Sequence, residues 1–265
     1  MRASFLHIKG IGTRTEERIW RAGVSCWDEL ARARPESVPF SPSRRELLLA
    51  AIRDSEQALE RRDADFFTGN LPAAEAWRVF DEFREECAFL DIETDGGPMG
   101  YYGGSITMVG VCDVRGVHAF VRGFNLEDFP QFMRRFRLMV TYNGKTFDAP
   151  HIEAEFGGVL RHCGHIDLRY VCRKAGYAGG LKSVEEAMGI ARPEEVRGLD
   201  GLDAVRLWLE WRQAGKVESL RRLILYNACD ILTLEPILCR AANELMKSRR
   251  MPRLKTGLNC PKYLP

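Results

Sequence analysis

Over the first 66 residues, hydrophobic positions recur at helical spacing between segments rich in proline and glycine. Residues 44–62 predict a helix, because their apolar side chains fall roughly on one side: Leu47, Leu48, Ile52 and Leu59. Residues 13–23 predict a shorter helix. The segment 34–44 contains three prolines and is expected to lie outside any helix. A second break, at residues 63–72, ends this part of the chain.

Beyond that break, short apolar runs alternate with stretches of helical spacing. The runs predict five strands, at 87–93, 105–114, 117–123, 138–143 and 162–168, with a hairpin about Arg115 and Gly116. Helices are predicted at 126–136 and 149–156, and from residue 181 onward, ending in a long segment at 216–247. This order predicts an α/β fold with a mixed sheet flanked by helices. We therefore expect a small helical module at 1–66 and the main domain at 67–265.

Composition fits a globular protein that works in the cytoplasm. The chain has 265 residues, of which 45% are hydrophobic, so it can bury a full core. No run of 18 apolar residues occurs, and the first residues lack the apolar stretch of a signal peptide. Its eight cysteines form no C-x-x-C pair, and we expect them to pack as small hydrophobic side chains without disulfides.

The formal net charge of +2 excludes a uniformly polybasic protein, but the charge is unevenly distributed. From Arg240 to the end, one acid, Glu244, accompanies seven basic residues: Arg240, Lys247, Arg249, Arg250, Arg253, Lys255 and Lys262. A basic tail beside an acidic centre suits a polyanionic partner. A solvated helix end followed by a loose terminus explains the same charges equally well.

Two carboxylates stand at the end of an apolar strand. Asp91 and Glu93 are two residues apart, so their side chains leave the same face of the predicted strand. Like charges side by side repel each other unless a cation lies between them, and no Lys or Arg is near in sequence. The alternative is that both acids lie in a solvated turn, which Gly96 and Gly97 would favour.

Asp148 follows another strand and the turn signal Asn143-Gly144, where a helix is predicted to begin. An aspartate in that position commonly caps the helix. It also stands at the carboxyl edge of a sheet strand, where α/β proteins gather their chemistry. The sequence leaves both roles open.

The long helix near the C-terminus carries Tyr226 and Asp230 at positions i and i+4, so the two side chains stack on one face. Leucines and isoleucines surround them in sequence. A charge buried there without a partner costs several kcal/mol. Asp230 therefore calls for a partner, unless it lies on an exposed stripe with Asn227 and Thr233.

Together these acids form a set of oxygen ligands of the kind that Mg²⁺ or Mn²⁺ prefers. Two such ions about 4 Å apart clamp the attacking and leaving oxygens of a phosphodiester. The cations would also remove the repulsion between Asp91 and Glu93. The acids therefore predict a metal site that acts on phosphodiesters.

Three motifs, taken in order, resemble those of a nuclease family. D-x-E at 91–93, N-G-x-x-F-D at 143–148 and Y-x-x-x-D at 226–230 are similar to the motifs of the DEDD (DnaQ-like) 3′–5′ exonucleases, which have a ribonuclease-H-like fold. Segments such as LDIETDG, TYNGKTFDAPHI and LYNACDILTL resemble the YprB-type ribonuclease-H-like branch. The resemblance covers about residues 70–242.

The resemblance implies a function and a set of roles. By this resemblance, the metal ligands of the protein would be Asp91, Glu93, Asp148 and Asp230, which would hold two divalent ions, Mg²⁺ or Mn²⁺. Tyr226, four residues before Asp230, places the chain in the tyrosine subclass, whose hydroxyl orients the attacking water. Because the unperturbed pKa of tyrosine is near 10, a positioning role is easier to defend than that of a general base.

Other residues are candidates for contact with the substrate. Asn143 is expected to help hold either the substrate or the end of a strand. Lys182 and Ser183 begin a predicted helix at which a phosphate could rest, although they also suit a plain helix start. Asp167 ends the last predicted strand and is expected to be a structural acid rather than a metal ligand.

Residues 6–24 resemble one helix-hairpin-helix motif, with a hairpin formed by Gly10, Ile11 and Gly12. Its glycines would let backbone N–H groups approach a phosphate, and Lys9 and Arg14 flank them. Thr13 and Glu16 predict a capping box at the start of the next helix. Such modules usually hold DNA, which favours DNA over RNA. A glycine turn that merely opens a helical module is the alternative.

The leading prediction is a metal-dependent 3′–5′ exonuclease whose partner is nucleic acid with a 3′ end, without a membrane partner. One alternative is a ribonuclease-H-like endonuclease. The other is a catalytically silent nucleic-acid-binding module of a repair or processing complex. All four acids and the tyrosine are present, which favours activity. The motifs leave open whether a helicase or polymerase assists the protein.

Overall fold

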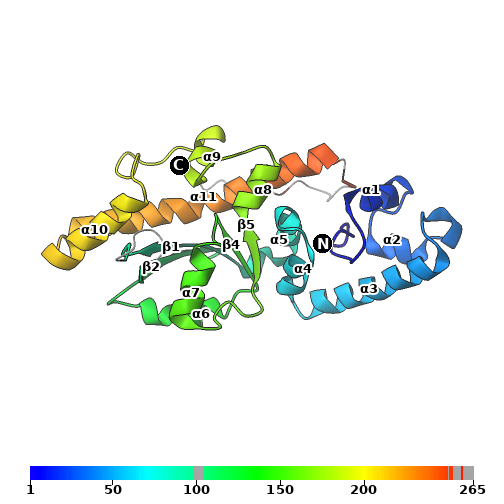
Figure 1. The fold of residues 1–265 in the computed structure, drawn as a ribbon, viewed down its shortest axis with the longest axis horizontal. Coiled ribbons are helices and arrows are strands. Elements are labelled where there is room, and N and C mark those ends of the chain that lie inside the picture. The colour runs from blue at the N-terminus through cyan, green and yellow to red at the C-terminus, as the bar shows by residue number, and fades with distance from the viewer. Residues whose placement is uncertain (98–103, 250, 253–257, 259–265) are drawn as a thin grey trace.

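The computed structural model describes residues 1–97, 104–249, 251–252 and 258, and these form an elongated molecule (Figure 1). Its helices are α1 (Thr13–Arg21), α2 (Trp27–Arg32), α3 (Pro42–Glu60), α4 (Ala64–Asn70), α5 (Phe80–Phe83), α6 (Phe129–Met133), α7 (Asp148–Phe156), α8 (Leu168–Lys174), α9 (Leu181–Ala187), α10 (Gly201–Ala214) and α11 (Val217–Arg249). Short 3₁₀ helices are η1 (Pro35–Ser37), η2 (Ala73–Val79), η3 (Arg84–Glu86) and η4 (Leu126–Asp128).

The centre of the molecule is a mixed five-stranded sheet in the order β3-β2-β1-β4-β5. Its strands are β1 (Cys87–Thr94), β2 (Ile106–Asp113), β3 (Gly116–Val121), β4 (Leu138–Thr141) and β5 (Gly164–Asp167). β2 pairs antiparallel with both β1 and β3, whereas β4 runs parallel to β1 and β5. The predicted α/β class, the mixed sheet and its flanking helices are confirmed.

The central strand β1 has a different helical layer on each face. Because side chains alternate along a strand, Leu90 and Ile92 point to one face, where they pack in an apolar cluster with residues of α6 and α7. Phe89 points to the other face and packs in a cluster with residues of α11. Asp91 and Glu93 continue this second face. The long helix α11 therefore lies over the two carboxylates (Figure 1).

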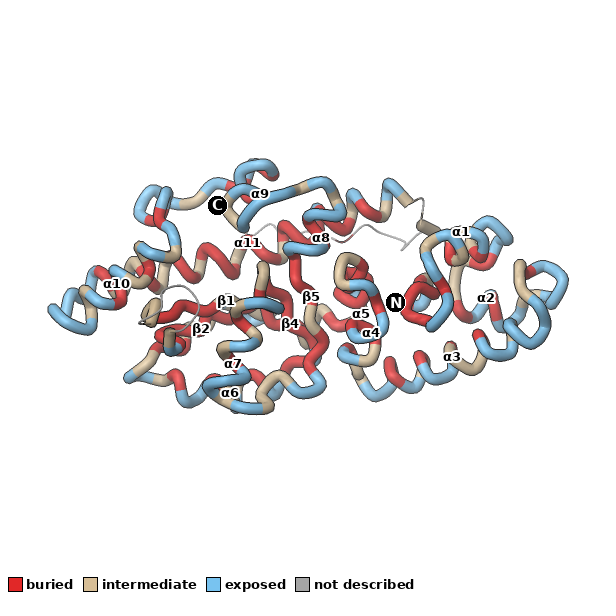
Figure 2. Tube along the Cα trace, in the orientation of Figure 1, coloured by how far each residue is buried: buried red, intermediate tan, exposed pale blue. Residues whose placement is uncertain are grey.

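The N-terminal helices share a core with the rest of the chain. One apolar cluster contains Phe5 and Trp27 from the first part, Trp77 and Phe80 from the connecting helices, and Leu238 from α11. Figure 2 shows buried segments on both sides of the contact between this part and α4 and α5. The division of the chain at residue 66 stays a prediction, but the two parts are packed together.

Two local predictions for the first part were wrong. Pro42 begins α3, because a proline at the first helical position loses no hydrogen bond, and the Ser41 hydroxyl caps that helix. The supposed break at 63–72 contains α4, which Asp63 caps through the Phe66 N–H at 2.9 Å. Tertiary packing decides the conformation there, since Phe67 is fully buried.

Within α3, Leu47 does not share the buried side with its neighbours. It is 72% exposed, whereas Leu48, Ile52 and Leu59 are buried. The helices α2 and α8 were not predicted, because each has only six or seven residues, too few for a repeat of apolar positions to stand out. In the part of the chain that the structure describes, no helix has the length and apolar character needed to cross a lipid bilayer.

Candidate metal centre

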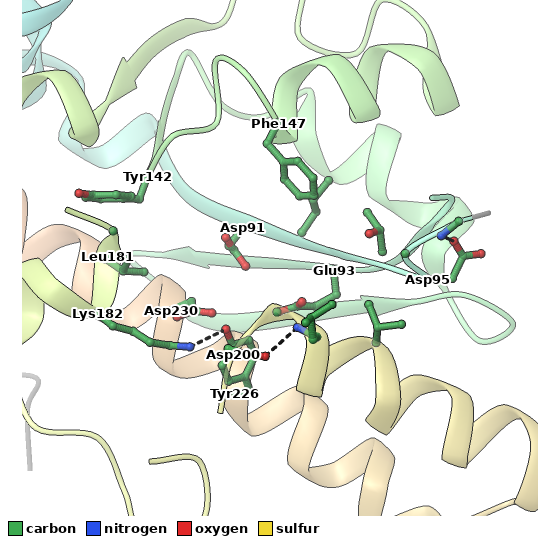
Figure 3. Close-up of a pocket in the computed structure, with 18 of the residues that line it drawn as sticks. Asp91, Glu93, Asp95, Tyr142, Phe147, Leu181, Lys182, Asp200, Tyr226 and Asp230 are labelled. Carbon is green, nitrogen blue, oxygen red and sulfur yellow. Dashed lines mark hydrogen bonds between the residues drawn. The ribbon is translucent and has the colours of Figure 1, made fainter. Parts of the chain in front are cut away.

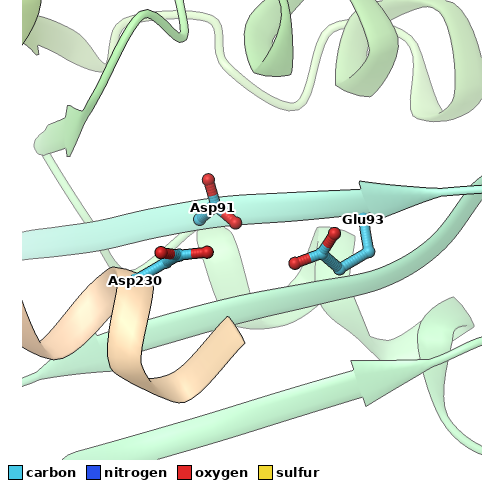
Figure 4. Close-up of side chains that lie close together, drawn as sticks. All are labelled: Asp91, Glu93 and Asp230. Atoms are coloured by element: carbon cyan, nitrogen blue, oxygen red, sulfur yellow. The ribbon is translucent and has the colours of Figure 1, made fainter. Parts of the chain in front are cut away.

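Three carboxylates meet where α11 crosses β1. Asp91 and Glu93 come from the strand and Asp230 from the helix, and one oxygen of each lies within 4.8 Å of the others. Figure 4 shows the three side chains pointing toward one another. Among the described residues, no other group of three or more His, Cys, Asp or Glu side chains has a geometry that could hold a metal ion. Three of the four acids expected to hold metal therefore lie together, and the fourth is Asp148.

Glu93 and Asp230 are buried and Asp91 is half-buried within β1, which excludes two of the alternatives for these acids. Glu93 is 7% exposed and Asp230 is 6% exposed, so neither lies in a solvated turn or on an exposed stripe. Asn227 and Thr233, the other members of that supposed stripe, are buried too. Glu93 and Asp230 are therefore largely shielded from solvent.

Burial raises the pKa of each carboxylate, and the charges of nearby acids raise it further. The pKa values of Asp91 and Glu93 lie well above the usual range. Burial is the largest cause, and repulsion from the neighbouring acids raises both values further. Burial raises the pKa of Asp230 to about 6, against the opposing effect of Arg192. A set of buried acids that resists ionisation is relieved by protons or by cations. The donor set of carboxylate oxygens fits a hard divalent cation such as Mg²⁺ or Mn²⁺.

Asp148 stands beside the three-carboxylate cluster rather than in it. Its Oδ1 accepts a hydrogen bond from the Ile92 N–H at 3.1 Å, between the two acids of β1. Its charge contributes to the raised pKa of Asp91, and burial raises its own pKa to about 7. The residue before α7 is Phe147, and no side chain caps this helix. Asp148 therefore faces the carboxylates instead of capping α7.

The side-chain amide of Asn227 contacts both acids of β1, and the sequence did not predict this role. It is fully buried, and its Nδ2 donates to Asp91 Oδ2 at 2.9 Å and lies 3.4 Å from Glu93 Oε1. The opposite residue on β2, Gly110, leaves the space that this amide fills. A glycine inside a strand often marks a close approach of another group. That glycine was the only sequence signal for Asn227.

Arg192 provides the partner that Asp230 required. Its guanidinium contacts Asp230 Oδ1, and it binds both oxygens of Glu185 at 2.7 and 2.8 Å. Glu185 also accepts a hydrogen bond from the Thr233 hydroxyl at 2.7 Å. Nothing in the spacing of the sequence pointed to Arg192, because it lies in a loop 38 residues before Asp230. A buried cation therefore offsets one of the acids.

Tyr226 lies on the same face of α11 as Asp230, as predicted, and is 6% exposed. Lys182 Nζ donates to its hydroxyl at 3.2 Å (Figure 3). Burial raises the pKa of Tyr226 far above its usual value, and the charges of Asp230, Glu93 and Asp91 raise it further. The phenol therefore stays neutral and keeps its proton.

These side chains line a cavity of about 600 Å³. Its wall includes Asp91, Glu93, Tyr226, Asp230 and Lys182, and it continues past Tyr142 and Leu181 at one end (Figure 3). Ser183 is exposed and does not line this cavity, although its neighbour Lys182 does. The helix α9 begins at Leu181, so Lys182 and Ser183 lie in its first turn, as predicted.

Asp167 holds the turn that carries Asn143. Its carboxylate accepts the backbone N–H groups of Asn143 at 2.8 Å, Lys145 at 3.1 Å and Arg169 at 3.0 Å. Asn143 has a positive φ of 67° and accepts a hydrogen bond from Arg169. The predicted structural role of Asp167 agrees with these contacts, and Asn143 lies outside the carboxylate cluster.

The residues of the N-terminal hairpin that were predicted to contact a nucleic-acid backbone do not line the cavity of the carboxylate cluster. Lys9, Gly10 and Gly12 line a hollow of about 480 Å³, and Arg14 is exposed nearby. Residues 1–12 contain turns and no helix, so the first helix of a helix-hairpin-helix is not present in them. Gly12 precedes α1 as its cap residue, and no side chain caps it.

The predicted capping box was wrong because Glu16 has other partners. Its carboxylate accepts the backbone N–H groups of Phe5 at 2.8 Å and Leu6 at 3.0 Å. It also forms a buried ion pair with Arg78 at 2.9 Å. Glu16 thus joins α1 to η2 instead of capping its own helix.

The basic tail has partners where the structure describes it. Arg240 contacts the Met188 carbonyl, Lys247 pairs with Glu244 at 3.4 Å, and Arg249 pairs with Glu75. The other four basic residues of the predicted tail lie outside the described residues: Arg250, Arg253, Lys255 and Lys262.

Comparison with known proteins places this fold in a family. The model of the RNase_H superfamily matches residues 88–242, whereas no curated protein matches the chain. The solved structures that are similar include the family B DNA polymerase of the hyperthermophilic archaeon Pyrobaculum calidifontis, with 19% identity and a TM-score of 0.44 over 63% of this chain and 27% of the polymerase chain. They also include the Nibbler EXO domain of Aedes aegypti, with 11% identity and a TM-score of 0.41 over 66% of this chain and 91% of that domain. This chain therefore spans little more than a quarter of the polymerase. The family match covers more than half of the chain and all the residues of the carboxylate cluster, and the chain belongs to the RNase_H superfamily.

Proposed function

We propose that the protein is a metal-dependent 3′–5′ exonuclease that hydrolyses phosphodiester bonds of nucleic acid. The observation that carries this proposal is the cluster of Asp91, Glu93 and Asp230 at the wall of an open cavity. Membership of the RNase_H superfamily supports a nuclease. The 3′–5′ direction rests on the resemblance of the three motifs to the DEDD exonucleases.

Asp91, Glu93 and Asp230 would hold divalent cations, with Asp148 directly beside them. Two bound Mg²⁺ or Mn²⁺ ions would supply an activated water and stabilise charge on the phosphate. Asn227 keeps Asp91 and Glu93 in place through its amide. Arg192 forms ion pairs with both Glu185 and Asp230, and so holds the Asp230 carboxylate in place before any metal ion binds.

Tyr226 would orient the attacking water or the substrate phosphate. Because its pKa is raised, the hydroxyl remains neutral and is unsuited to act as a general base. Lys182 donates to the hydroxyl oxygen, which leaves the hydroxyl hydrogen available to a water or a phosphate oxygen in the cavity. Lys182 itself lines the cavity, and its positive charge acts against the rise in the pKa values of Glu93 and Asp230.

The preference for DNA over RNA is part of the proposal and rests on the N-terminal hairpin. Lys9, Gly10 and Gly12 surround a hollow that would receive a backbone phosphate, with Arg14 close by. Residues 1–66 would then act as a DNA-binding module joined to the exonuclease domain at 67–265. Asn143 and Ser183 are further candidates for contact with the strand.

The test is a degradation assay with Mg²⁺ or Mn²⁺ on 5′-labelled single-stranded DNA, duplex DNA and RNA. A ladder that shortens from the 3′ end, and that disappears with chelator and in Asp91→Ala and Asp230→Asn, would support the proposal. Tyr226→Phe should lower kcat by roughly 10²-fold and change KM little. A circular single strand separates the alternatives, because an exonuclease leaves it intact and an endonuclease cuts it. Binding without any cleavage would point to a silent binding module.

A further inference from the structure

A second hollow, of about 650 Å³, adjoins the metal-centre cavity and shares Tyr142, Gly180 and Leu181 with it. Its other lining residues are Asn143, Arg169, Arg173, Tyr177 and the segment 178–179. In Figure 3 the shared wall lies at the end of the first cavity where Tyr142 and Leu181 stand together. The two hollows are therefore neighbours along one continuous surface.

The charge of this second hollow is positive. Arg169 and Arg173 are spaced i, i+4 on α8, so both project from one side of the helix. Both are exposed, and neither forms an ion pair with any described residue. No aspartate or glutamate lines the hollow. By contrast, Lys174 on the same helix is paired with Glu75 at 3.3 Å.

Two of these side chains, Arg169 and Tyr142, are held by hydrogen bonds within the protein. Arg169 Nη1 donates to Asn143 Oδ1 at 2.5 Å, and the backbone of Asn143 is held in turn by Asp167. The Tyr142 hydroxyl donates to the Gly179 carbonyl at 2.7 Å, which sets the ring on the boundary between the hollows. Tyr177 adds a second aromatic side chain. Arginines without an ion pair, beside aromatic rings, are a combination that binds single-stranded nucleic acid.

We propose that this hollow, which we term the arginine groove, binds the single strand immediately upstream of the nucleotide at the carboxylates. Arg169 and Arg173 contact its backbone phosphates, and Tyr142 and Tyr177 offer surfaces for its bases. This inference rests on the proposed function, since it assumes that a strand end reaches the carboxylate cluster. The occupant is a single strand, because only unpaired bases expose their faces to an aromatic ring.

The first test measures binding of the full-length protein to a labelled single strand of about ten nucleotides, in DNA and RNA forms, with chelator present to prevent cleavage. Arg169→Ala/Arg173→Ala should weaken binding roughly tenfold at low salt and reduce the slope of log K against log[salt] by about 1.4, for two lost phosphate contacts. Arg173→Ala alone makes no other change to the described contacts and should reduce the slope by about 0.7.

The matched control is Arg134→Ala/Arg161→Ala, which also removes two exposed arginines without an ion pair among the described residues. This control should bind as the wild type does. An unchanged slope in the Arg169/Arg173 variant, an equal loss in the control, or no binding by the wild type would overturn the proposal. Equal losses on DNA and RNA are expected, since both polymers carry the same phosphates.

The second test separates the groove from the catalytic proposal. With metal present, the ratio of kcat/KM for the strand of about ten nucleotides to that for the p-nitrophenyl ester of a nucleoside 5′-monophosphate should fall roughly tenfold in the Arg169/Arg173 variant. The ester carries no upstream nucleotide to occupy the groove, so an unchanged ratio would refute the groove while leaving the exonuclease intact. If no substrate is cleaved but the binding losses occur, the exonuclease proposal fails and the groove stands.

Discussion

Asn227 and Gly110 fit against each other so closely that a β-carbon on Gly110 would lie 1.7 Å from Asn227 Oδ1. Gly110 pairs with Asp91 across the antiparallel strands. The Asn227 amide, which packs on Gly110, therefore lies next to the Asp91 carboxylate. It then donates to Asp91 at 2.9 Å and approaches Glu93 at 3.4 Å. A missing side chain on one strand thus makes room for the group that holds two acids of its neighbour.

Gly110→Ala should therefore weaken metal binding, because the new methyl group displaces the amide from Asp91 and Glu93. Loss of such a supporting contact typically lowers metal affinity by about 10–100-fold. Isothermal titration with Mn²⁺ measures this affinity. The matched control is Gly69→Ala on α4, where a β-carbon meets nothing within 4 Å, and its affinity should equal that of the wild type.

The two positions should also be coupled in stability. Overpacking at Gly110 is expected to cost about 1–3 kcal/mol of unfolding free energy in the wild type. In Asn227→Ala the clashing amide is gone, so Gly110→Ala should add much less. A double-mutant cycle by urea unfolding measures this difference. Additive effects would show that the steric contact has no energetic consequence.

Arg192 should stabilise the protein chiefly when no metal is bound. Arg192→Met leaves Glu185 and Asp230 as buried acids without their cation, which typically costs about 3–5 kcal/mol. A bound cation would neutralise Asp230 again. We therefore expect the increase in Tm on adding Mn²⁺ to be larger in Arg192→Met than in the wild type.

Two controls define this effect of Arg192. Arg192→Lys keeps the charge but loses the two-pronged contact with Glu185, so its loss of stability should be smaller. Arg221→Met breaks only an exposed pair with Glu218 and should change the unfolding free energy by less than about 1 kcal/mol. If Arg192→Met and Arg221→Met have the same Tm with chelator present, the guanidinium of Arg192 has no role in holding Asp230.

Metal binding should depend on pH in a direction set by the carboxylates. The pKa of Asp148 is raised to about 7 and that of Asp230 to about 6, both from a usual value of 3.8. Folded-state pKa values above the unfolded ones favour the folded protein below about pH 4, and this contribution is lost as pH rises to about 7. Protons and metal ions compete for the same oxygens.

The increase in Tm caused by Mn²⁺ should thus be larger at about pH 8 than at about pH 5.5. Differential scanning calorimetry with and without the ion measures both values. In Asp230→Asn one of the competing protons is removed, and the dependence on pH should be flatter. An increase in Tm that is the same at both pH values would contradict a site made of these carboxylates.

Local spacing was enough to predict the acids but not their supports. Asp91 and Glu93 alternate on one strand, and Tyr226 and Asp230 follow the helical repeat, so each pair could be placed from neighbouring positions alone. Asn227 lies 136 residues from Asp91 in sequence, and only the packing of α11 on β1 brings them together. Arg192 emerges from a loop for which no periodicity exists.

The same limit explains the secondary structure that sequence reasoning missed. The segment of α4 carries glycine, asparagine and aspartate, which are typical of turns, and its helix is stabilised by the burial of Phe67. Glu16 fits the spacing of a capping box, yet Arg78, 62 residues away, together with nearby backbone N–H groups, determines where its carboxylate goes. Contacts between distant segments decided both outcomes.

The ion pair of Glu16 and Arg78 joins α1 to η2, and both parts of the chain share one apolar cluster. Glu16 is fully buried, and Arg78 is 4% exposed. Arg78→Met would leave the Glu16 carboxylate buried without a cation and should lower the unfolding free energy by about 3–5 kcal/mol. Urea unfolding should remain a single transition, because the apolar cluster runs through both parts of the chain.

A second substitution tests the electrostatic origin of that loss. Adding Glu16→Gln to Arg78→Met removes the uncompensated charge but keeps a side-chain oxygen that accepts from the Phe5 and Leu6 N–H groups. Part of the lost stability should return, because a neutral amide is far cheaper to bury than a lone carboxylate. If the double variant is no more stable than Arg78→Met, the loss does not come from the uncompensated charge of Glu16. If unfolding splits into two transitions, residues 1–66 fold independently of the rest of the chain.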